Sequence, residues 1–269
     1  MSEALQQAAG ERLRRALAAL TRTPLTGALA GMVVTAVVQS SSATTVMVIG
    51  FVSAGLLELP QAVAVIFGAN IGTTVTAQLL AFRVEEMLGL VLFGGFFLCA
   101  VARTKRGRQM GTAVFSFGLL FAGMEQIQSV VEPLALRPEF EAWMAQVREK
   151  PLWGLLLGLG MTLVVQSSSA TIGVLQGVAR QAGPDGVHSL LGLAGAVPVL
   201  LGDNVGTTIT AILAAAGGTR DAKRAAAAHC CFNLSGSLVC LLALPWFVRL
   251  VELLPPEIIP GSAFGICIV

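Results

Sequence analysis

The hydrophobic pattern of the chain consists of long apolar stretches that contain short polar clusters. Between Leu25 and Phe82 the only ionisable residue is Glu58, yet this stretch holds a glutamine, three consecutive serines and an asparagine. A bilayer core needs about 20 residues of helix, so the stretch is too long for one span. We interpret residues 25–57 as a helical hairpin that enters and leaves on one side, with the serines at its tip. Residues 60–82 are predicted to cross the membrane as a helix interrupted at its Gly-Ala-Asn-Ile-Gly-Thr-Thr segment.

The rest of the chain follows a related plan. Two plainer spans are predicted at 87–102 and 109–124, and the second half is predicted to hold a hairpin at 151–181, an interrupted crossing at 187–217 and a span at 225–248. The expected fold class is therefore an all-α integral membrane protein built from two repeats, each with a re-entrant helical hairpin and an interrupted transmembrane helix.

Two polar motifs occur twice. Residues 35–44 return as residues 162–171, 127 positions later, with one difference in ten. Residues 68–77 return in similar form as residues 202–211, 134 positions later. Because both motifs recur in the same order and with almost the same spacing, we interpret the chain as an internal duplication.

Composition and loop charge give the setting and the orientation. Hydrophobic residues make up 55% of the chain, charged residues 12%, and mean hydropathy is +0.80, which indicates an integral membrane protein. Basic residues gather in three segments, 1–23, 103–108 and 220–224, which we place in the cytoplasm. Since three crossings separate the two hairpins, the halves are predicted to be inverted. The scattered basic residues form no continuous face for nucleic acid, and the histidines and cysteines are too dispersed for a metal cluster.

These interpretations divide the chain into five parts. They are an amphipathic helix at the membrane surface (1–23), a first repeat (24–124), an extracellular connecting loop (125–150), a second repeat (151–250) and a C-terminal segment that reads as truncated (251–269). Alternatively the chain is a short form, or one completed by homo-oligomerisation.

Hydroxyls and amides are costly at membrane depth unless they have partners or line a site. Helix N-termini and hydroxyls in broken helices bind anions, while carbonyls and hydroxyls hold small cations. Neither hairpin core contains Arg or Lys, which favours an anion accompanied by sodium ions. Asp203 stands where the first repeat has Ala69 and is the one carboxylate predicted inside the membrane. It is interpreted as a cation ligand or a proton carrier, or else as a helix cap.

Three sequence features resemble the type II sodium/phosphate cotransporters and their bacterial relatives. They are the duplicated Gln-Ser-Ser-Ser, the Gly-Ala-Asn-Ile-Gly-Thr-Thr and Gly-Asp-Asn-Val-Gly-Thr-Thr segments, and Ala-His-x-x-Phe-Asn at 228–233. The resemblance implies sodium-coupled uptake of inorganic phosphate across the plasma membrane, without an organic cofactor. It implies a substrate and sodium site formed by Gln39, Ser40, Ser41, Ser42, Gln166, Ser167, Ser168 and Ser169. Further ligands implied by the motifs are Thr44, Asn70, Thr73, Thr171, Asn204 and Thr207.

Other functions stay open at this point. One is transport of another oxyanion or a carboxylate, or proton-coupled transport through Asp203. Another is a membrane protein that senses phosphate without transporting it. An enzyme is not expected, because the chain has no Gly-x-Ser-x-Gly elbow and neither histidine is near a serine cluster in sequence.

Overall fold

The computed structural model describes residues 19–81, 87–181 and 189–253, and the elements of these residues are all α-helices. The all-helical prediction is thus confirmed for the described residues. The helices are α2 (Pro24–Val38), α3 (Ser41–Ser53), α4 (Leu59–Ala81), α5 (Leu88–Val101), α6 (Lys105–Ala135), α7 (Pro138–Glu149), α8 (Pro151–Val165), α9 (Ser168–Arg180), α10 (Gly192–Ala215) and α11 (Arg220–Glu252). Most of the predicted N-terminal amphipathic helix and of the C-terminal segment lies outside the described residues.

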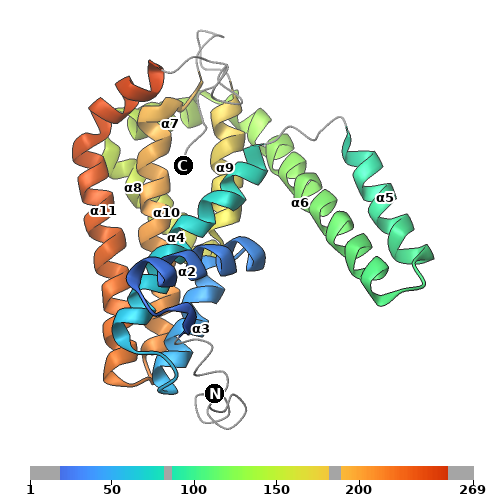
Figure 1. Ribbon diagram of the computed structural model, residues 1–269. Helices are drawn as coiled ribbons and strands as arrows, with labels where there is room; N and C mark the ends of the chain where they lie inside the picture. Colours follow the sequence, from blue (N-terminus) through green and yellow to red (C-terminus); the bar gives the residue numbers. More distant parts are fainter. Residues whose placement is uncertain (1–18, 82–86, 182–188, 254–269) are drawn as a thin grey trace.

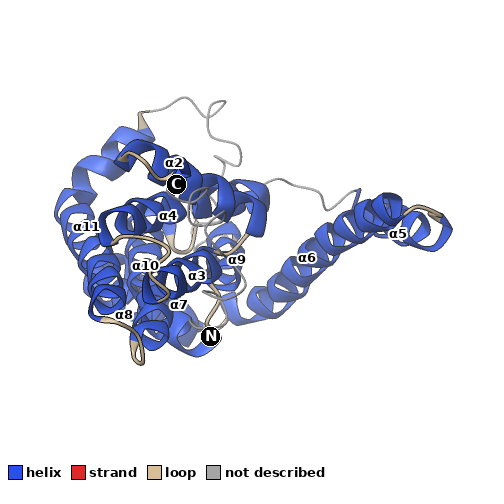
Figure 2. Ribbon diagram, turned by 60° about the horizontal axis from the view of Figure 1, so that its bottom comes forward, coloured by secondary structure: helices blue, strands red, loops and turns tan. Residues whose placement is uncertain are grey.

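The helices form a main body and an arm. The body contains α2 to α4 and α7 to α11, whereas α5 packs along α6 and the two extend away from it (Figures 1 and 2). One core cluster of the body joins α3, α4, α10 and α11, and a second joins α6, α7, α9 and α10. The body therefore combines helices from both halves of the chain.

Glycines bring α2 against α4, and α8 against α10, at backbone contact. A Cβ atom added to Gly31 would lie 2.0 Å from the carbonyl oxygen of Val65, and one added to Gly158 would lie 1.9 Å from that of Val199. These distances are shorter than any real Cβ contact, so only glycine fits. The same packing thus recurs in both halves.

The predicted interruption of the two crossing helices is wrong, because α4 and α10 are continuous through their Gly-x-Asn-x-Gly segments. The glycines serve helix packing instead. A Cβ on Gly72 would lie 2.7 Å from the Cβ of Thr35, and one on Gly206 would lie 2.7 Å from that of Thr162. Small residues at these positions let the hairpin approach without unwinding the helix.

The stretch predicted as a connecting loop at 125–150 is mostly helical. Helix α6 continues to Ala135, and α7 begins with Pro138 at its first turn. Glu139 in the first turn and Arg148 in the last turn of α7 have the charges that the helix dipole favours. The extracellular position of this stretch stays a prediction.

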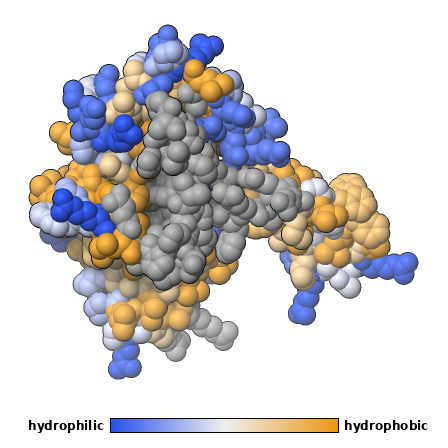
Figure 3. Space-filling model, turned by 90° about the horizontal axis from the view of Figure 1, so that it is seen from above, coloured by the Kyte–Doolittle hydropathy of each residue, from blue (hydrophilic) through white to orange (hydrophobic). Residues whose placement is uncertain are grey.

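Large apolar side chains cover much of the outer surface. Val164, for example, is 84% exposed and Phe93 is 67% exposed. The arm is largely hydrophobic, with hydrophilic side chains at its end (Figure 3). Three described helices, α6, α10 and α11, are long and apolar enough to cross a membrane. These features fit a membrane protein whose apolar surface faces lipid.

Candidate substrate and ion site

Each Gln-Ser-Ser-Ser motif forms the turn of a helix–turn–helix hairpin. Gln39 and Gln166 end α2 and α8 in the left-handed conformation, both with φ 58°, and no other non-glycine residue of the described ranges has a positive φ. The next residue caps the second helix, since Ser40 Oγ accepts from the Ala43 amide at 3.2 Å and Ser167 Oγ does so from its counterpart at 3.3 Å. A left-handed non-glycine residue costs about 1–3 kcal/mol and is typical of functional sites.

The remaining serines have free hydroxyls at the start of α3 and α9. Ser41, Ser42, Ser168 and Ser169 are half-buried in the first turns of these helices. Within the described part of the chain their hydroxyls make no hydrogen bond to protein. Unpaired amides at a helix N-terminus together with free hydroxyls form an arrangement that binds oxyanions.

The glutamine side chains turn back on their own hairpins. Gln39 Nε2 donates to the carbonyl oxygen of Ala36 at 2.5 Å, and Gln166 Nε2 donates to that of Leu163 at 3.1 Å. The role of these glutamines as ligands stays a prediction.

Below each tip, two buried threonines join the hairpin arms. Thr35 Oγ1 donates to Thr44 Oγ1 at 3.0 Å, and Thr162 Oγ1 lies 3.3 Å from Thr171 Oγ1. Thr35 and Thr162 were not among the predicted site residues. The signal was present in the sequence, because both open the repeated ten-residue motif.

Asp203 of α10 reaches the threonine pair of the second hairpin. Its Oδ1 accepts a hydrogen bond from Thr162, and the side chain is 2% exposed. The first half has Ala69 at this place, fully buried and without a polar group. The acid is therefore buried in the protein and, among the described residues, bonded to the second hairpin only, while its place inside the membrane stays a prediction.

An asparagine of α11 connects the two Gly-x-Asn-x-Gly segments. Asn233 Oδ1 accepts from Asn70 Nδ2 at 2.7 Å, and Asn233 Nδ2 donates to the carbonyl oxygen of Asn204 at 2.8 Å. The same amide lies 3.1 Å from His229 Nε2. His229 and Asn233 belong to the Ala-His-x-x-Phe-Asn segment at 228–233, but neither was among the predicted ligands.

The remaining predicted ligands bond within their own helix. Thr73 Oγ1 donates to the carbonyl oxygen of Ala69 at 3.3 Å, and Thr207 Oγ1 donates to that of Asn204 at 2.7 Å. The side chain of Asn204 is exposed. These groups lie on the crossing helices, and their contact with the serine tips stays a prediction.

The two halves are joined crosswise. Helix α3 of the first hairpin packs on α10, and α9 of the second hairpin contacts α4. Ile49 of α3 and Ala211 of α10, for example, belong to one buried cluster. Each hairpin is thus supported by the crossing helix of the other half.

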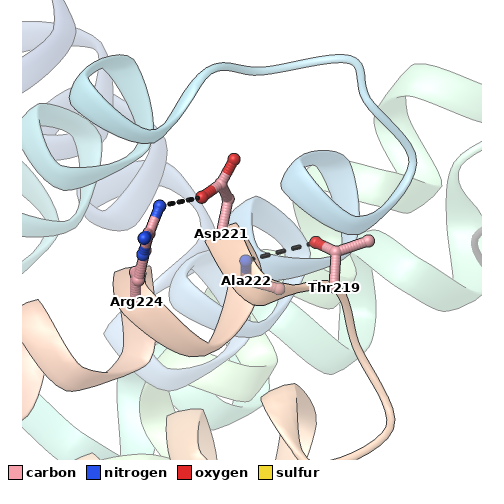
Figure 4. A network of polar contacts seen from close by, with 4 residues as sticks. All are labelled: Thr219, Asp221, Ala222 and Arg224. Carbon is pink, nitrogen blue, oxygen red and sulfur yellow. Dashed lines mark hydrogen bonds and ion pairs between the residues drawn. The ribbon is translucent and has the colours of Figure 1, made fainter.

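A polar hollow at the start of α11 lies apart from the predicted site residues. Its volume is about 650 Å³, and its lining includes Ser53, Glu58, Thr219, Asp221 and Arg224. Thr219 caps the helix and Asp221 pairs with Arg224 (Figure 4). The ion pair measures 3.0 Å between Arg224 Nη1 and Asp221 Oδ1. Both partners of this ion pair are exposed, so it contributes little to stability.

Comparison with known proteins identifies the family. The model of the Na+/Pi-cotransporter family matches the chain twice, over residues 1–129 and 130–252. The chain belongs to the Na+/Pi-cotransporter family. The two matches divide this family member into the same halves as the repeated motifs.

Individual relatives agree with this assignment. The family member is 32% identical over 246 residues to YqeW, an uncharacterised protein of Bacillus subtilis, covering 91% of this chain and 78% of YqeW. It is 28% identical to YjbB of Salmonella typhimurium, whose name assigns it provisionally to inorganic phosphate export. That match covers 94% of this chain but only 45% of YjbB. A segment of 63 residues is 46% identical to sodium-dependent phosphate transport protein 2A of Ovis aries, 10% of that protein. No solved structure matches the chain.

Proposed function

We propose that this Na+/Pi-cotransporter family member is a sodium-coupled secondary transporter of inorganic phosphate in the plasma membrane. The observation that carries the proposal is the pair of equivalent hairpin tips. Each tip combines a left-handed glutamine, a capping serine and two serine hydroxyls that have no protein partner among the described residues. Family membership supplies phosphate as the substrate class.

The chemistry of the tips suits phosphate. Phosphate oxygens accept hydrogen bonds from backbone amides and hydroxyls, and both donor types are free at the N-termini of α3 and α9. Within the described ranges neither hairpin presents an Arg or Lys at its tip. The negative charge of the anion therefore requires bound cations, for which sodium ions are the proposal.

Inward movement of sodium provides the driving force. Each Na+ that crosses a potential of about 100 mV contributes about 2.3 kcal/mol. In the proposed arrangement the two hairpins are re-entrant from opposite sides, in inverted repeats, so that both serine tips approach the membrane centre. The crosswise packing of α3 on α10 and of α9 on α4 supports this arrangement.

Phosphate export is the second candidate. The name of YjbB assigns that relative to phosphate export, and this chain aligns with it over 94% of its own length. The same site serves both directions, because the gradients of the ions and of phosphate decide the net flux through a secondary transporter.

Uptake of labelled phosphate into proteoliposomes tests the proposal. We expect accumulation with an inward sodium gradient and none with an equal potassium gradient. Arsenate should compete, because it matches phosphate in shape and charge, whereas sulfate should not. Equal uptake in sodium and potassium would contradict sodium coupling, and strong competition by sulfate would contradict phosphate specificity.

A further inference from the structure

The threonine pair of the first hairpin has a complete set of hydrogen bonds. Thr35 Oγ1 donates to Thr44 Oγ1 at 3.0 Å, and Thr44 Oγ1 donates to the carbonyl oxygen of Ser40 at 3.0 Å. Each hydroxyl carries one proton, so the two hydroxyl protons are sufficient for these two hydrogen bonds. Nothing further is needed to satisfy this cluster.

The equivalent cluster of the second hairpin has more contacts than protons. Thr162 Oγ1 lies 3.0 Å from the carbonyl oxygen of Gly158, 3.3 Å from Thr171 Oγ1, and within hydrogen-bonding distance of Asp203 Oδ1. Thr171 Oγ1 also lies 3.3 Å from the carbonyl oxygen of Ser167. Four oxygen–oxygen contacts thus share two hydroxyl protons, and an ionised Asp203 brings none. The cluster is short of positive charge.

No cationic side chain among those that the structure describes supplies that charge. Asp203 and Thr162 are each 2% exposed and Thr171 is 1% exposed, so bulk solvent does not reach the carboxylate. Of the described residues, none forms an ion pair with Asp203. Arg148 of α7 packs by its backbone against Gly195, eight residues before Asp203 on α10.

The other helices that pack on α10 do not change this balance. Helices α3 and α8 contain no ionisable side chain. The one ionisable residue of α9 is Arg180, which ends that helix nine residues after Thr171. On α11, His229 contacts Asn233 through Nε2 and does not reach Asp203. The remaining charged residues on α7 and the described part of α11 are Glu139, Glu141, Glu149, Arg220, Asp221, Lys223, Arg224 and Arg249, and none is bonded to Asp203.

We propose that Asp203, Thr162, Thr171 and the carbonyl group of Gly158 form a sodium site that exists in the second half of the chain only. Carboxylate, hydroxyl and carbonyl oxygens are the ligands that hard cations take. The inference rests on the proposed function and deepens it, because it assigns one coupling ion to a defined set of atoms beneath the second serine tip. The first half has no counterpart, since Ala69 replaces the acid there.

Thermal unfolding of the purified protein tests the site directly. The Tm is measured without phosphate, once in sodium chloride and once in choline chloride. A ligand that binds the folded state raises its stability by mass action. We expect sodium to raise the Tm of the wild type, and Asp203→Ala and Asp203→Asn to abolish this rise. Thr171→Val should shift the rise to higher sodium concentration while Asp203 remains, which keeps the test valid if the Asp203 variants fail to fold.

Glu139→Gln provides the matched control, because it removes one negative charge from an exposed position on α7. Its response to sodium should equal that of the wild type. The site is overturned if sodium does not stabilise the wild type more than choline does, or if Asp203→Asn and Thr171→Val both retain the full response. Phosphate uptake by the wild type is measured separately, so failure of this site is distinguishable from failure of the transport function.

Discussion

The side-chain amide of Asn70 donates a 2.7 Å hydrogen bond to Oδ1 of Asn233, 163 residues later in the chain. The side-chain amide nitrogen of Asn233 in turn donates to the carbonyl oxygen of Asn204 and lies within hydrogen-bonding distance of His229 Nε2. All the polar atoms of one buried side chain on α11 are therefore used to join α4 to α10. Since Asn70 and Asn204 are equivalent positions of the two halves, α11 fixes how the halves meet.

Replacing Asn233 by alanine should destabilise the protein. The change leaves the side-chain amide of Asn70 without this partner, which costs about 1–3 kcal/mol for a buried group left unsatisfied. It also removes one donor to the carbonyl oxygen of Asn204, which keeps the hydroxyl of Thr207. Thermal unfolding in detergent measures the effect. Ser235→Ala on the same helix is the control, because Ser235 is exposed and bonds only to Phe232 of its own helix. Equal Tm values for the two variants would show that the asparagine connection adds no stability.

The serines should separate into two groups by their effects. Ser41→Ala and Ser168→Ala remove hydroxyls that have no described protein partner, so phosphate binding should weaken about ten- to hundredfold, as expected for a hydrogen bond to a charged group. Their Tm should change little. Uptake and unfolding measured on the same preparations test this, and normal uptake by both variants would remove the serine tips from the site.

Ser40→Ala and Ser167→Ala are predicted to act on stability first. Each removes a helix cap, at a cost of about 0.5–2 kcal/mol. We expect a lower Tm in both variants, measured by thermal unfolding against the Ser41→Ala variant. An unchanged Tm would mean that water or a neighbouring group replaces the cap.

Gln39 offers a way to separate backbone geometry from side-chain chemistry. Gln39→Gly keeps the left-handed turn without strain, whereas Gln39→Val places a β-branched residue at φ 58° and should destabilise the hairpin by about 1–3 kcal/mol more. Unfolding of the two variants measures the difference. Loss of uptake in the stable glycine variant would show that the glutamine side chain itself is needed; a valine variant as stable as the glycine variant would contradict the geometry.

Gly158→Ala should be far more damaging than Gly160→Ala, although both lie on α8. A methyl group at 158 would meet the carbonyl oxygen of Val199 at 1.9 Å, while one at 160 meets no atom within 4 Å. Overpacking of this kind costs about 1–3 kcal/mol or more. Folded yield and Tm of the pair measure the effect, and similar values for both would argue against the close approach of α8 and α10.

The hairpin tips could be predicted from sequence because their determinants are local. A glutamine that ends one helix and a serine that caps the next are adjacent in the chain, and the exact recurrence of the motif pointed to both copies. The burial of Asp203 was predictable for a similar reason, since the residue stands in an apolar segment.

The continuity of α4 and α10 could not be predicted in the same way. A glycine pair inside a helix fits a break as well as a close contact, and the partner helix that decides between them is distant in sequence. The bonds of Asn233 to Asn204 and Asn70, 29 and 163 residues away, depend on tertiary arrangement for the same reason. The helical form of residues 138–149 was missed because the whole stretch 125–150 was assigned as a connecting loop between two predicted membrane segments.

The glycine contacts of α2 with α4 and of α8 with α10 leave no layer of side chains in which one helix could slide past the other. The two helices of each pair should therefore move together as one rigid body during any change between outward- and inward-facing states. Spin labels on α2 and α4 would report the same separation in sodium, in phosphate and in neither. Such a pair provides a fixed reference within the protein, relative to which a displacement of α3, α9 or α11 could be measured.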